Sequence, residues 1–366
     1  MKRTIGIIEC NYSSKAIGQL GSTRPLASLP FHGRYRVVDF ALSNMTNADV
    51  TVIGMIMPTN YRSIIDHVGA GKEWGLIRKR GGLFIEPGSP FGTARTGGRF
   101  LLEDLLKNKA IFTRNDYDYV VFASANVVFT VDYDQVLEAH TQTGADITVL
   151  AKTVTPGHAD ADLINLDVKD GRVTGFSSGV AEGDTAFLDS FIINKEKLFE
   201  LMDRYETKDY LDLFEAMEGE FDRINVQVFD FNEYVAPVFN LKSFYEVNRE
   251  LLELDNQRSL FPRGRKVKTK SHDTSPAKYE AGSKVTNSSI SSSCIIKGTV
   301  EGSVLGRHCI VEPGAVVIDS LLMQGAHVMS GARVENAVID RNNTIPANTV
   351  IQGTKDDIFY LTKAAD

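Results

Sequence analysis

A six-residue periodicity near the C-terminus constrains the fold of this 366-residue chain more than any other feature. Aliphatic residues recur there mostly six positions apart, at Ile290, Ile296, Val304, Ile310, Val316, Leu322, Val328, Val334, Ile339, Ile345 and Ile351. A small residue often stands two positions earlier, as at Gly302, Gly314, Ser320, Ala326, Ala332 and Ala337. Such hexapeptide repeats are typical of parallel β-helices, because the aliphatic side chain fills a narrow interior and the small residue lets the chain turn. The pattern predicts a left-handed β-helix over residues 281–366, including a C-terminal tail.

The first 255 residues show a different pattern, in which apolar strands alternate with amphipathic helices. Strands are predicted at residues 4–9, 50–57, 119–123 and 147–153, and helices at 37–42, 101–106, 134–143 and 244–254. Strand–helix–strand units at this spacing build a mainly parallel sheet with right-handed crossovers. A hairpin signal at Lys169-Asp170-Gly171 adds antiparallel strands. We therefore predict an α/β domain over residues 1–255, a basic linker or strap over 256–280, and the β-helix behind it.

Composition excludes several classes of function. The formal net charge is −7 and the pI is about 5.6, which argues against general affinity for nucleic acid. The longest uncharged run, residues 119–131, is too short to span a membrane. Cys10, Cys294 and Cys309 are scattered and form no CxxC pair, so neither a disulfide framework nor a structural zinc site is expected. This cysteine usage, and an apolar start that Glu9 cuts short, predict a cytoplasmic protein without a signal peptide.

Residues 30–44, PFHGRYRVVDFALSN, are the most distinctive stretch outside the repeats. They predict a helix with Gly33 and Asn44 as end markers, and its apolar stripe is formed by Val37, Val38, Ala41 and Leu42. This run resembles the segment after the nucleotide-binding loop in glucose-1-phosphate adenylyltransferases (ADP-glucose pyrophosphorylases) of bacterial glycogen synthesis. Further similarity lies at residues 65–69, 92–94 and 243–248 and through the repeats. The resemblance implies a nucleotidyltransferase-like domain followed by a left-handed β-helix, serving the conversion of ATP and glucose 1-phosphate to ADP-glucose and diphosphate.

The phosphate-binding parts of that family are missing from this sequence. Active members open with a glycine-rich loop whose backbone N–H groups cradle the nucleotide phosphates, and an arginine and a lysine then neutralise charge as the α-phosphate is attacked. Counting back from Pro30 without gaps, the loop glycines correspond to Asn11, Tyr12 and Ser14. The arginine corresponds to Ala16 and the lysine to Leu26. A tyrosine at a place where backbone must approach phosphate is a steric block.

The magnesium ligands of the family are missing as well. Mg²⁺ prefers hard, charged oxygen ligands, and the family supplies them from two aspartates at strand ends. The matching residues here are Asn126, in SANVVF, and Pro237, which has no side-chain ligand. The sugar-phosphate-binding lysine of the family is also absent, because its motif reads Phe176-Ser177-Ser178-Gly179-Val180 in this chain.

These losses predict a chain that is catalytically inactive alone. One lost cationic group costs roughly 10³ to 10⁵ in rate and one lost preorganised donor roughly 10² to 10³, although such losses do not add. The resemblance therefore points to the D-type regulatory subunit, which binds the catalytic adenylyltransferase subunit in a heterotetramer; a homo-oligomer of the isolated chain stays open. No cofactor is expected for this chain, since magnesium is used by the catalytic partner. Gly92 and Thr93 are candidates for a residual nucleotide cleft.

A phosphorylated sugar effector is a further expected partner. In relatives such effectors bind between the two domains, where basic side chains face the cleft. The candidate anion-binding residues here are two arginines near the start of the chain and three basic residues of the strap, namely Arg34, Arg36, Arg263, Arg265 and Lys266.

Three alternatives remain open from the sequence. A weakly active adenylyltransferase would use Lys15 and Arg24 in place of the lost cations. A stand-alone sugar-phosphate sensor would need no partner. Acyl transfer, the chemistry of hexapeptide-repeat acyltransferases, would draw on His308 or His327 of the repeats. Asp66-His67 has the form of a catalytic pair, for which packing of the histidine in a helix is the simpler account.

Overall fold

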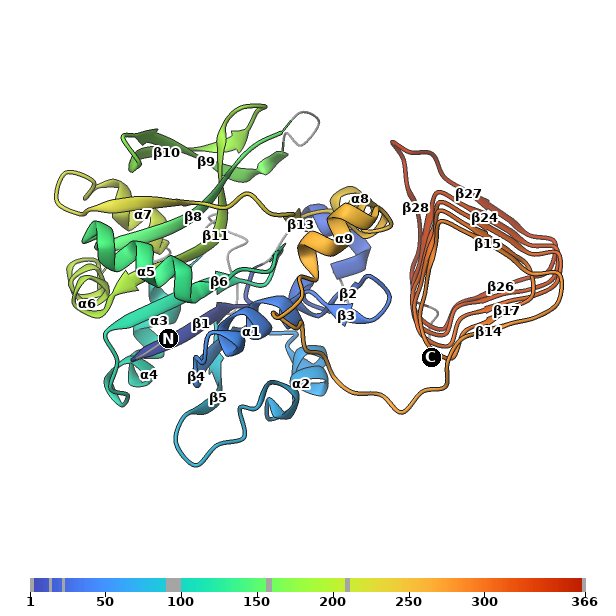
Figure 1. Ribbon diagram of the computed structural model, residues 1–366, viewed down its shortest axis with the longest axis horizontal. Helices are drawn as coiled ribbons and strands as arrows, with labels where there is room; N and C mark the ends of the chain where they lie inside the picture. The colour runs from blue at the N-terminus through green and yellow to red at the C-terminus, as the bar shows by residue number, and fades with distance from the viewer. Residues whose placement is uncertain are drawn as a thin grey trace.

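The computed structural model describes residues 3–12, 15–21, 24–89, 100–155, 160–207 and 211–363. It consists of an α/β domain and a triangular β-helix that lie next to each other, joined by an extended strap (Figure 1). The predicted order, an α/β domain followed by a left-handed parallel β-helix, is confirmed. Among the described residues, no helix combines the length and the apolar character that a membrane span requires.

A nine-stranded mixed sheet forms the centre of the α/β domain, in the order β5-β4-β1-β6-β11-β8-β12-β10-β9. The strands are β1 Thr4–Glu9, β4 Val52–Met57, β5 Gly82–Pro87, β6 Tyr119–Ser124, β8 Ile147–Thr153, β9 Asp160–Lys169, β10 Arg172–Val180, β11 Thr185–Asn194 and β12 Val226–Asp230. β1 is parallel to β4 and β6, whereas β11 is antiparallel to β6 and β8, and β9 and β10 form the predicted hairpin. Because β1 and β6 are parallel, the residues that follow them meet at one edge of the sheet.

Helices cover both faces of this sheet, and each face has its own apolar core. One face carries α1 (Val38–Asn47), α2 (Arg62–Val68) and α5 (Tyr133–Thr143). The other carries α3 (Leu102–Lys107), α4 (Lys109–Thr113), α6 (Lys195–Arg204) and α7 (Leu213–Glu218). Between the sheet and the β-helix lie α8 (Leu241–Glu250) and α9 (Leu254–Leu260) (Figure 1). Short elements complete the domain: η1 Lys15–Gly21, η2 Leu26–Ser28, η3 Lys72–Trp74, β2 Pro30–Phe31, β3 Tyr35–Arg36, β7 Val127–Val128 and β13 Ala236–Pro237.

Helix α1 confirms the helix predicted from the distinctive stretch, but it continues past the expected end. Asn44, interpreted as an end marker, is buried inside α1. Its side-chain amide donates to Phe129 O (2.9 Å) and its carbonyl accepts from Val131 N (3.2 Å). That interpretation was wrong, because Asn44 makes its side-chain hydrogen bonds with a segment distant in sequence and does not mark the end of the helix. Gly33, the other marker, has φ +68° at the β2–β3 turn, where an added Cβ would lie 2.9 Å from Leu305 O of the β-helix.

Three parallel sheets form the sides of the β-helix. The first contains β14 Lys278–Tyr279, β17 Ile295–Ile296, β20 Ile310–Val311, β23 His327–Val328 and β26 Thr344–Ile345. The second contains β15 Lys284–Thr286, β18 Thr299–Glu301, β21 Val316–Ile318, β24 Arg333–Glu335 and β27 Val350–Gln352. The third, which faces the α/β domain, contains β16 Ser289–Ile290, β19 Val304–Leu305, β22 Leu321–Leu322, β25 Ala337–Ile339 and β28 Phe359–Leu361 (Figure 1).

The interior of the β-helix corrects part of the predicted repeat. Ile296, Leu322, Val328, Val334, Ile339 and Ile345 are buried in its core as expected. In the middle coils, however, the core residues are Leu305, Val311 and Val317, each one position after the predicted Val304, Ile310 and Val316. Neighbouring residues of a strand point to opposite faces, so a shift of one position exchanges inside and outside. The sequence was ambiguous there because both residues of each pair are aliphatic.

The two domains share a hydrophobic interface rather than a flexible joint. Leu26, Phe31 and Phe244 from the α/β domain pack in one core with Val304, Leu321 and Val338 of the third β-helix sheet and with Met323, which follows β22. Polar contacts flank this core: the Tyr245 hydroxyl donates to Asp319 O (2.6 Å), and Arg249 Nε donates to Gly302 O (3.2 Å). Burial of apolar surface at about 25 cal/mol per Å² makes such an interface strongly stabilising. The relative position of the two domains is therefore part of the fold.

The strap between the domains is tied down by α1 and α2. It runs from the end of α9 at Leu260 to the start of β14 at Lys278, and is therefore shorter than the predicted 256–280. Lys268 N donates to Ser43 Oγ (2.9 Å), and Asn47 Nδ2 donates to Lys266 O (3.2 Å). Lys270 Nζ donates to Asp66 O (2.5 Å). These contacts hold the basic strap against the α/β domain.

We expect the three cysteines to be unreactive in the native chain. Cys10, Cys294 and Cys309 are each at most 1% exposed. Burial also raises the pKa of Cys10 and of Cys309 well above the usual value, so these two carry little thiolate. The hydrogen bond with Cys309 lowers the pKa of Cys294, so Cys294 is protected by its burial alone. A colorimetric thiol titration should therefore detect no thiol in buffer and all three in denaturant. Rapid labelling of any of them under native conditions would contradict this burial.

Candidate functional site

The residues that replace the phosphate loop form a buried network at the end of β1. Asn11 N donates to Glu9 Oε1 (2.6 Å), and Asn11 Nδ2 donates to Asp104 Oδ2 (3.1 Å) and to Ser89 O (3.2 Å). Glu9 and Asp104 are both fully buried. Desolvation, and for Glu9 also the neighbouring Asp104, raises the pKa of each carboxyl group. The position that corresponds to the phosphate-binding loop of the family thus holds two carboxyl groups, and no described residue of this network is a cation.

Side chains also fill the space where backbone would have to approach a nucleotide. The Tyr12 ring lies edge-on to Phe239, with ring centroids 5.8 Å apart. Leu26, at the position of the lysine, is buried in the interdomain core. Ser14 lies outside the described residues, as do the side chain of Ala16 and both Gly92 and Thr93. The parts of the loop that are described are therefore packed as core.

The two positions that correspond to magnesium ligands are neighbours in space. Pro237 of β13 pairs with Val127 of β7, and Val238 N donates to Asn126 O (2.8 Å). Asn126 is fully buried, and its amide nitrogen donates to Asp189 Oδ2 (3.0 Å). The structure therefore brings together the positions that the sequence paired, but their side chains are an amide and a pyrrolidine ring. Neither group is a charged oxygen ligand of the kind Mg²⁺ prefers.

Restoring the family residue at Asn126 should weaken the fold instead of rebuilding a metal site. In Asn126→Asp a second carboxylate would face Asp189, so a hydrogen bond to a charged group is replaced by repulsion. We expect the free energy of unfolding to fall by about 1.5–3 kcal/mol. Chemical denaturation with and without Mg²⁺ measures it. Stabilisation of the variant by Mg²⁺, without the same effect on the unchanged chain, would show that the metal site had been recovered.

A basic cleft lies where the α/β domain meets the β-helix. It has a volume of about 270 Å³ and is lined from both domains and the strap. Its cationic and imidazole side chains are Arg24, Arg34, Arg36, His67, Lys270, His272, Arg307 and Arg341. Among the described lining residues, Asp66 is the only carboxylate. An excess of positive charge in a partly enclosed space attracts anions, and arginine forks suit phosphate oxygens.

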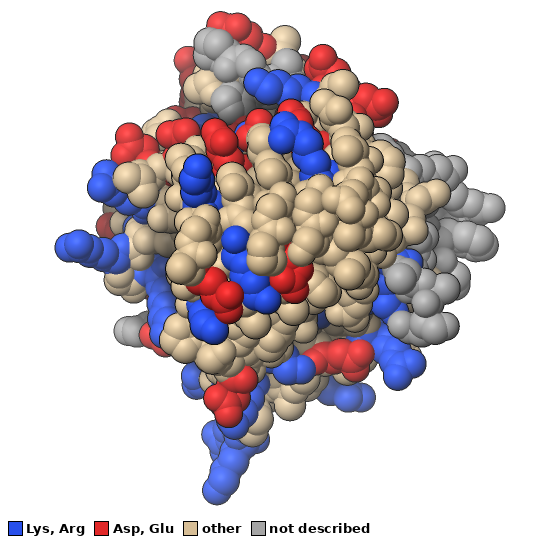
Figure 2. All heavy atoms as spheres, turned by 90° about the vertical axis from the view of Figure 1, so that its right-hand side faces the viewer, with Lys and Arg blue, Asp and Glu red and all other residues tan. Residues whose placement is uncertain are grey.

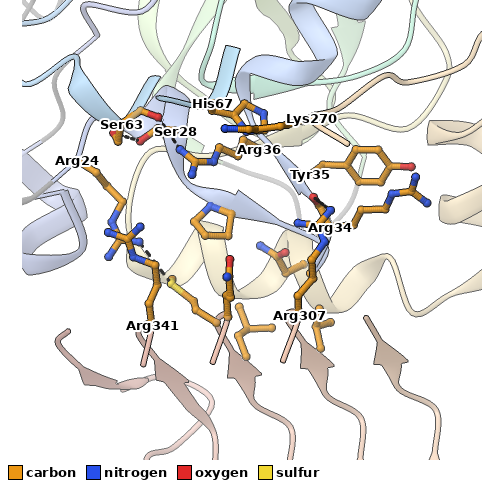
Figure 3. Close-up of a pocket in the computed structure, with 18 of the residues that line it drawn as sticks. Arg24, Ser28, Arg34, Tyr35, Arg36, Ser63, His67, Lys270, Arg307 and Arg341 are labelled. Atoms are coloured by element: carbon orange, nitrogen blue, oxygen red, sulfur yellow. Dashed lines mark hydrogen bonds between the residues drawn. The ribbon is translucent and has the colours of Figure 1, made fainter. Parts of the chain in front are cut away.

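The arginines of this basic cleft are arranged in two groups with one arginine between them. Figure 3 shows Arg24 and Arg341 at one end, Arg34 and Arg307 at the other, and Arg36 between. Arg307 Nη2 donates to Arg34 O (3.1 Å), which connects the β-helix to the β2–β3 turn. Repulsion between like charges at this spacing has to be offset by the fold or by a bound anion.

Arg36 lies in the middle of the basic cleft and is partly buried. Burial lowers its pKa to about 10, an effect that Asp39 opposes and that Arg341 and Arg24 add to. It therefore remains charged at neutral pH. Its backbone N donates to Asp39 Oδ2 (2.9 Å) and its Nη1 to Ser63 O (2.7 Å), which fixes the direction of the guanidinium group. His67 is buried in α2 and pairs with Asp39 (2.6 Å), in agreement with the simpler account of a histidine packed in a helix, and it helps to orient Asp39.

Arg24 joins the former loop region to the β-helix through a buried ion pair. Arg24 and Asp340 are each at most 2% exposed, and Arg24 Nη2 contacts Asp340 Oδ2. The Tyr360 hydroxyl donates to the same carboxylate (2.8 Å). Arg24 Nε is buried and has no hydrogen-bond partner among the described residues. Because Arg24 is committed to Asp340, it is not positioned to replace the lost arginine of the phosphate loop.

The anion-binding residues predicted from the sequence are only partly brought together. Arg34 and Arg36 line the basic cleft, whereas Arg263, Arg265 and Lys266 are not among the described lining residues. The strap contributes Lys270 and His272 instead, because its earlier part lies along α1. Arg307 and Arg341 were missed, since single arginines in a repeat give no signal before the third sheet is known to face the α/β domain. His327, considered for acyl transfer, pairs with Glu312 (3.2 Å) on the β-helix surface.

Two protein-family models match separate parts of the chain. Residues 19–177 match the nucleotidyl transferase family and residues 274–358 match the GlmU-like C-terminal hexapeptide family. With the fold described above, this defines a nucleotidyltransferase domain followed by a hexapeptide-repeat β-helix.

More specific relatives share nearly the whole length of the chain. Identity is 27% to the glycogen biosynthesis protein GlgD of Bacillus subtilis, over 98% of this chain and 95% of the relative. Identity to GlgD of Geobacillus stearothermophilus is 29%, over 86% of this chain and 83% of the relative. Identity to glucose-1-phosphate adenylyltransferase 2 of Alkalilimnicola ehrlichii is 27%, over 96% of this chain and 88% of the relative. The predicted resemblance to the glucose-1-phosphate adenylyltransferase family, and within it to GlgD, is thereby confirmed.

Proposed function

We propose that this chain is a non-catalytic regulatory subunit that binds the catalytic subunit of glucose-1-phosphate adenylyltransferase in the cytoplasm and supports ADP-glucose synthesis for glycogen. The observation that carries this proposal is the convergence of Tyr12, Asn126 and Pro237 in one packed cleft. The reaction depends on phosphate cations and a magnesium ion. Neither matched metal position, Asn126 or Pro237, carries a carboxylate, and the described contacts of Asn11 and Tyr12 include no cationic side chain. The names of the relatives, glycogen biosynthesis protein GlgD and glucose-1-phosphate adenylyltransferase, support the part of the proposal that concerns glycogen synthesis.

The basic cleft supplies the regulatory part of the proposal. It would bind an effector with two anionic groups, such as a phosphorylated sugar, between Arg34 and Arg307 at one end and Arg341 at the other. Since the cleft is lined by both domains, a bound anion would draw them together and alter surfaces that a partner contacts. The effector would thereby change how strongly this chain activates its partner.

The outer side of the β-helix is a suitable contact surface for the partner. Figure 2 shows a broad uncharged area on this side, beside a small cluster of basic and acidic groups near its centre and with further charged groups toward its edges. Partly exposed aliphatic side chains on the two outer sheets include Ile295, Ile310, Val316, Ile318, Met329 and Val350. Apolar patches rimmed by charge are typical of subunit interfaces. A heterotetramer with the catalytic subunit is the assembly that we propose.

The decisive experiment assays the catalytic subunit with and without this chain. We expect no ADP-glucose from this chain alone with ATP, glucose 1-phosphate and Mg²⁺, and faster synthesis by the mixture than by the catalytic subunit alone. ADP-glucose formed by the chain alone, and abolished by EDTA, would instead make it a weak adenylyltransferase. Binding of a sugar phosphate with no effect on the catalytic subunit would make it a stand-alone sensor.

A further inference from the structure

A second groove adjoins the basic cleft and follows the strap. It has a volume of about 730 Å³ and lies between the end of α9, the strap and the first coils of the β-helix, and we call it the strap groove. Five residues line both spaces, namely Arg34, Tyr35, Lys270, His272 and Arg307. Figure 3 shows Arg34, Tyr35 and Arg307 at the end of the basic cleft opposite to Arg24, and the strap groove therefore adjoins that end.

The positive charge of the basic cleft continues into the strap groove. The described lining of the groove has four cationic side chains, Arg34, Arg258, Lys270 and Arg307, and no carboxylate. Arg258 pairs with Asp255, but the two side chains are 75% and 97% exposed, so water screens this ion pair and leaves Arg258 available to a ligand. Two adjoining spaces of the same charge suit an extended chain of anionic groups better than a single one.

Two buried polar atoms of the strap groove have no hydrogen-bond partner in the described part of the chain. They are Nδ1 of His32, a residue that is 7% exposed, and Oγ1 of Thr269. His32 also has φ +45°, which is uncommon outside glycine, and its backbone N donates to Asn248 Oδ1 (2.6 Å). Buried polar groups are normally satisfied, and strained residues cluster at binding sites. A ligand that accepts hydrogen bonds would satisfy both atoms.

The aromatic rings of the strap groove are already packed against other groups. Tyr35 stacks on Phe261 (5.2 Å between ring centroids), and the Arg34 guanidinium lies over the Tyr35 ring (5.7 Å). His32 lies tilted against the same Phe261 (6.3 Å). Single-stranded nucleic acids bind largely by stacking their bases on aromatic side chains, which this arrangement does not favour. Hydroxyl donors for phosphate oxygens are present instead, at Ser271, Ser289 and Ser291.

We propose that the strap groove binds the distal part of a linear polyphosphate whose first phosphates lie in the basic cleft. Arg34 and Arg307, which line both spaces, hold the middle of the chain. Thr269 and His32 donate hydrogen bonds to the phosphates within the groove, and Arg258 contacts the far end. The proposal concerns binding to this chain alone, so it can fail while the regulatory role holds, and the reverse.

The length of the phosphate chain provides the first test. Diphosphate, tripolyphosphate and a long-chain polyphosphate are titrated into the full chain by isothermal titration calorimetry in metal-free buffer. We expect affinity and its dependence on salt to increase with length, because longer chains meet more positive charge. Equal affinity for the three would overturn the proposal. A single-stranded oligonucleotide with a similar number of phosphates should bind more weakly than long-chain polyphosphate, and tighter binding would identify a nucleic-acid site instead.

Thr269→Val separates a ligand contact from a structural one. Valine keeps the shape of threonine and removes the hydroxyl, whose Oγ1 has no described partner. We expect long-chain polyphosphate to bind roughly ten-fold more weakly, as for loss of a hydrogen bond to a charged group. Diphosphate binding and stability in chemical denaturation should not decrease. Unchanged binding of long-chain polyphosphate, or an equal loss for diphosphate, would contradict a contact within the groove.

A matched pair of arginine variants tests the far end of the strap groove. Arg258→Gln should weaken binding of long-chain polyphosphate about two- to five-fold, the usual range for an exposed charge pair, and should leave diphosphate binding unchanged. Arg263→Gln removes the same charge at an exposed position outside the described lining and should change neither. Equal effects of the two variants, or no effect of Arg258→Gln, would mean that the far end of the groove takes no part in binding.

Discussion

Replacing Arg24 by methionine should lower the free energy of unfolding by about 3–5 kcal/mol, the usual cost of leaving one partner of a buried ion pair uncompensated. Methionine keeps the length of the side chain, so the lost quantity is the charge and its hydrogen bonds. Among the described residues, Asp340 would then keep the Tyr360 hydroxyl and the backbone N of Arg341 as its side-chain partners while remaining buried. Chemical denaturation of both proteins, followed by circular dichroism, measures the difference.

The dependence of this effect on pH identifies its electrostatic origin. Burial alone would raise the pKa of Asp340, but the hydrogen bond and the charge of Arg24 lower it below the usual value. A lowered pKa in the folded state contributes stability above the pKa of the unfolded chain, and this stability disappears as pH falls through the folded value. The gap between the unchanged chain and Arg24→Met should therefore be widest near neutral pH and should narrow as Asp340 becomes protonated in acid.

A paired variant tests whether the charge or the shape matters. Arg24→Met combined with Asp340→Asn removes both charges, and asparagine can still accept the Tyr360 hydroxyl. We expect this double variant to be more stable than Arg24→Met alone, because no buried charge is left unpaired. If the double variant is no more stable than the single one, or if the single variant is as stable as the unchanged chain, the ion pair does not contribute as described.

Removing the arginines at one end of the basic cleft should largely abolish anion binding. Each charge-assisted hydrogen bond contributes about 1.5–3 kcal/mol, so Arg34→Gln and Arg307→Gln should each weaken binding roughly 10- to 150-fold. Inorganic diphosphate and a hexose bisphosphate are suitable probes, measured by calorimetry at two salt concentrations. Since the interaction is electrostatic, binding to the unchanged chain should also decrease as salt increases. The hexose bisphosphate should lose more than diphosphate if it spans both ends of the cleft.

The strap provides the matched control for this experiment. Arg263 and Lys266 are exposed, carry the same charge, and are not among the described lining residues of the basic cleft. Arg263→Gln and Lys266→Gln should therefore leave diphosphate binding unchanged, although the sequence alone marked both as anion-binding candidates. Equal losses from the strap variants and from Arg34→Gln would mean that the net charge of the region, and not the geometry of the cleft, attracts the ligand.

The parts of the fold that were predictable are those with a local pattern. Helix α5 begins and ends within a residue of its predicted bounds, because Asp132 caps its start and Gly144, with φ +59°, ends it. The repeat predicted the β-helix, yet it could not tell Leu305 from Val304 as the core residue, since both are aliphatic. Asn44 was misread for the opposite reason: its local signal is that of a helix end, and its actual partner, Phe129, is distant in sequence.

By itself, the sequence determined which residues stand at the positions matched to the family's glycine, aspartate and lysine, because Tyr12, Pro237 and Leu26 are read without any coordinates. The loss of activity that they predict stays a prediction. The sequence also determined the two architectures. The period of two residues marks strands, the period of three to four marks helices and the period of six marks the β-helix, and each can be read from nearby positions along the chain. Only the tertiary structure decided where positive charge accumulates. Arg24, Arg36, Arg307 and Arg341 come from segments about 300 residues apart, and they form one cleft solely because the third sheet of the β-helix packs on the α/β domain.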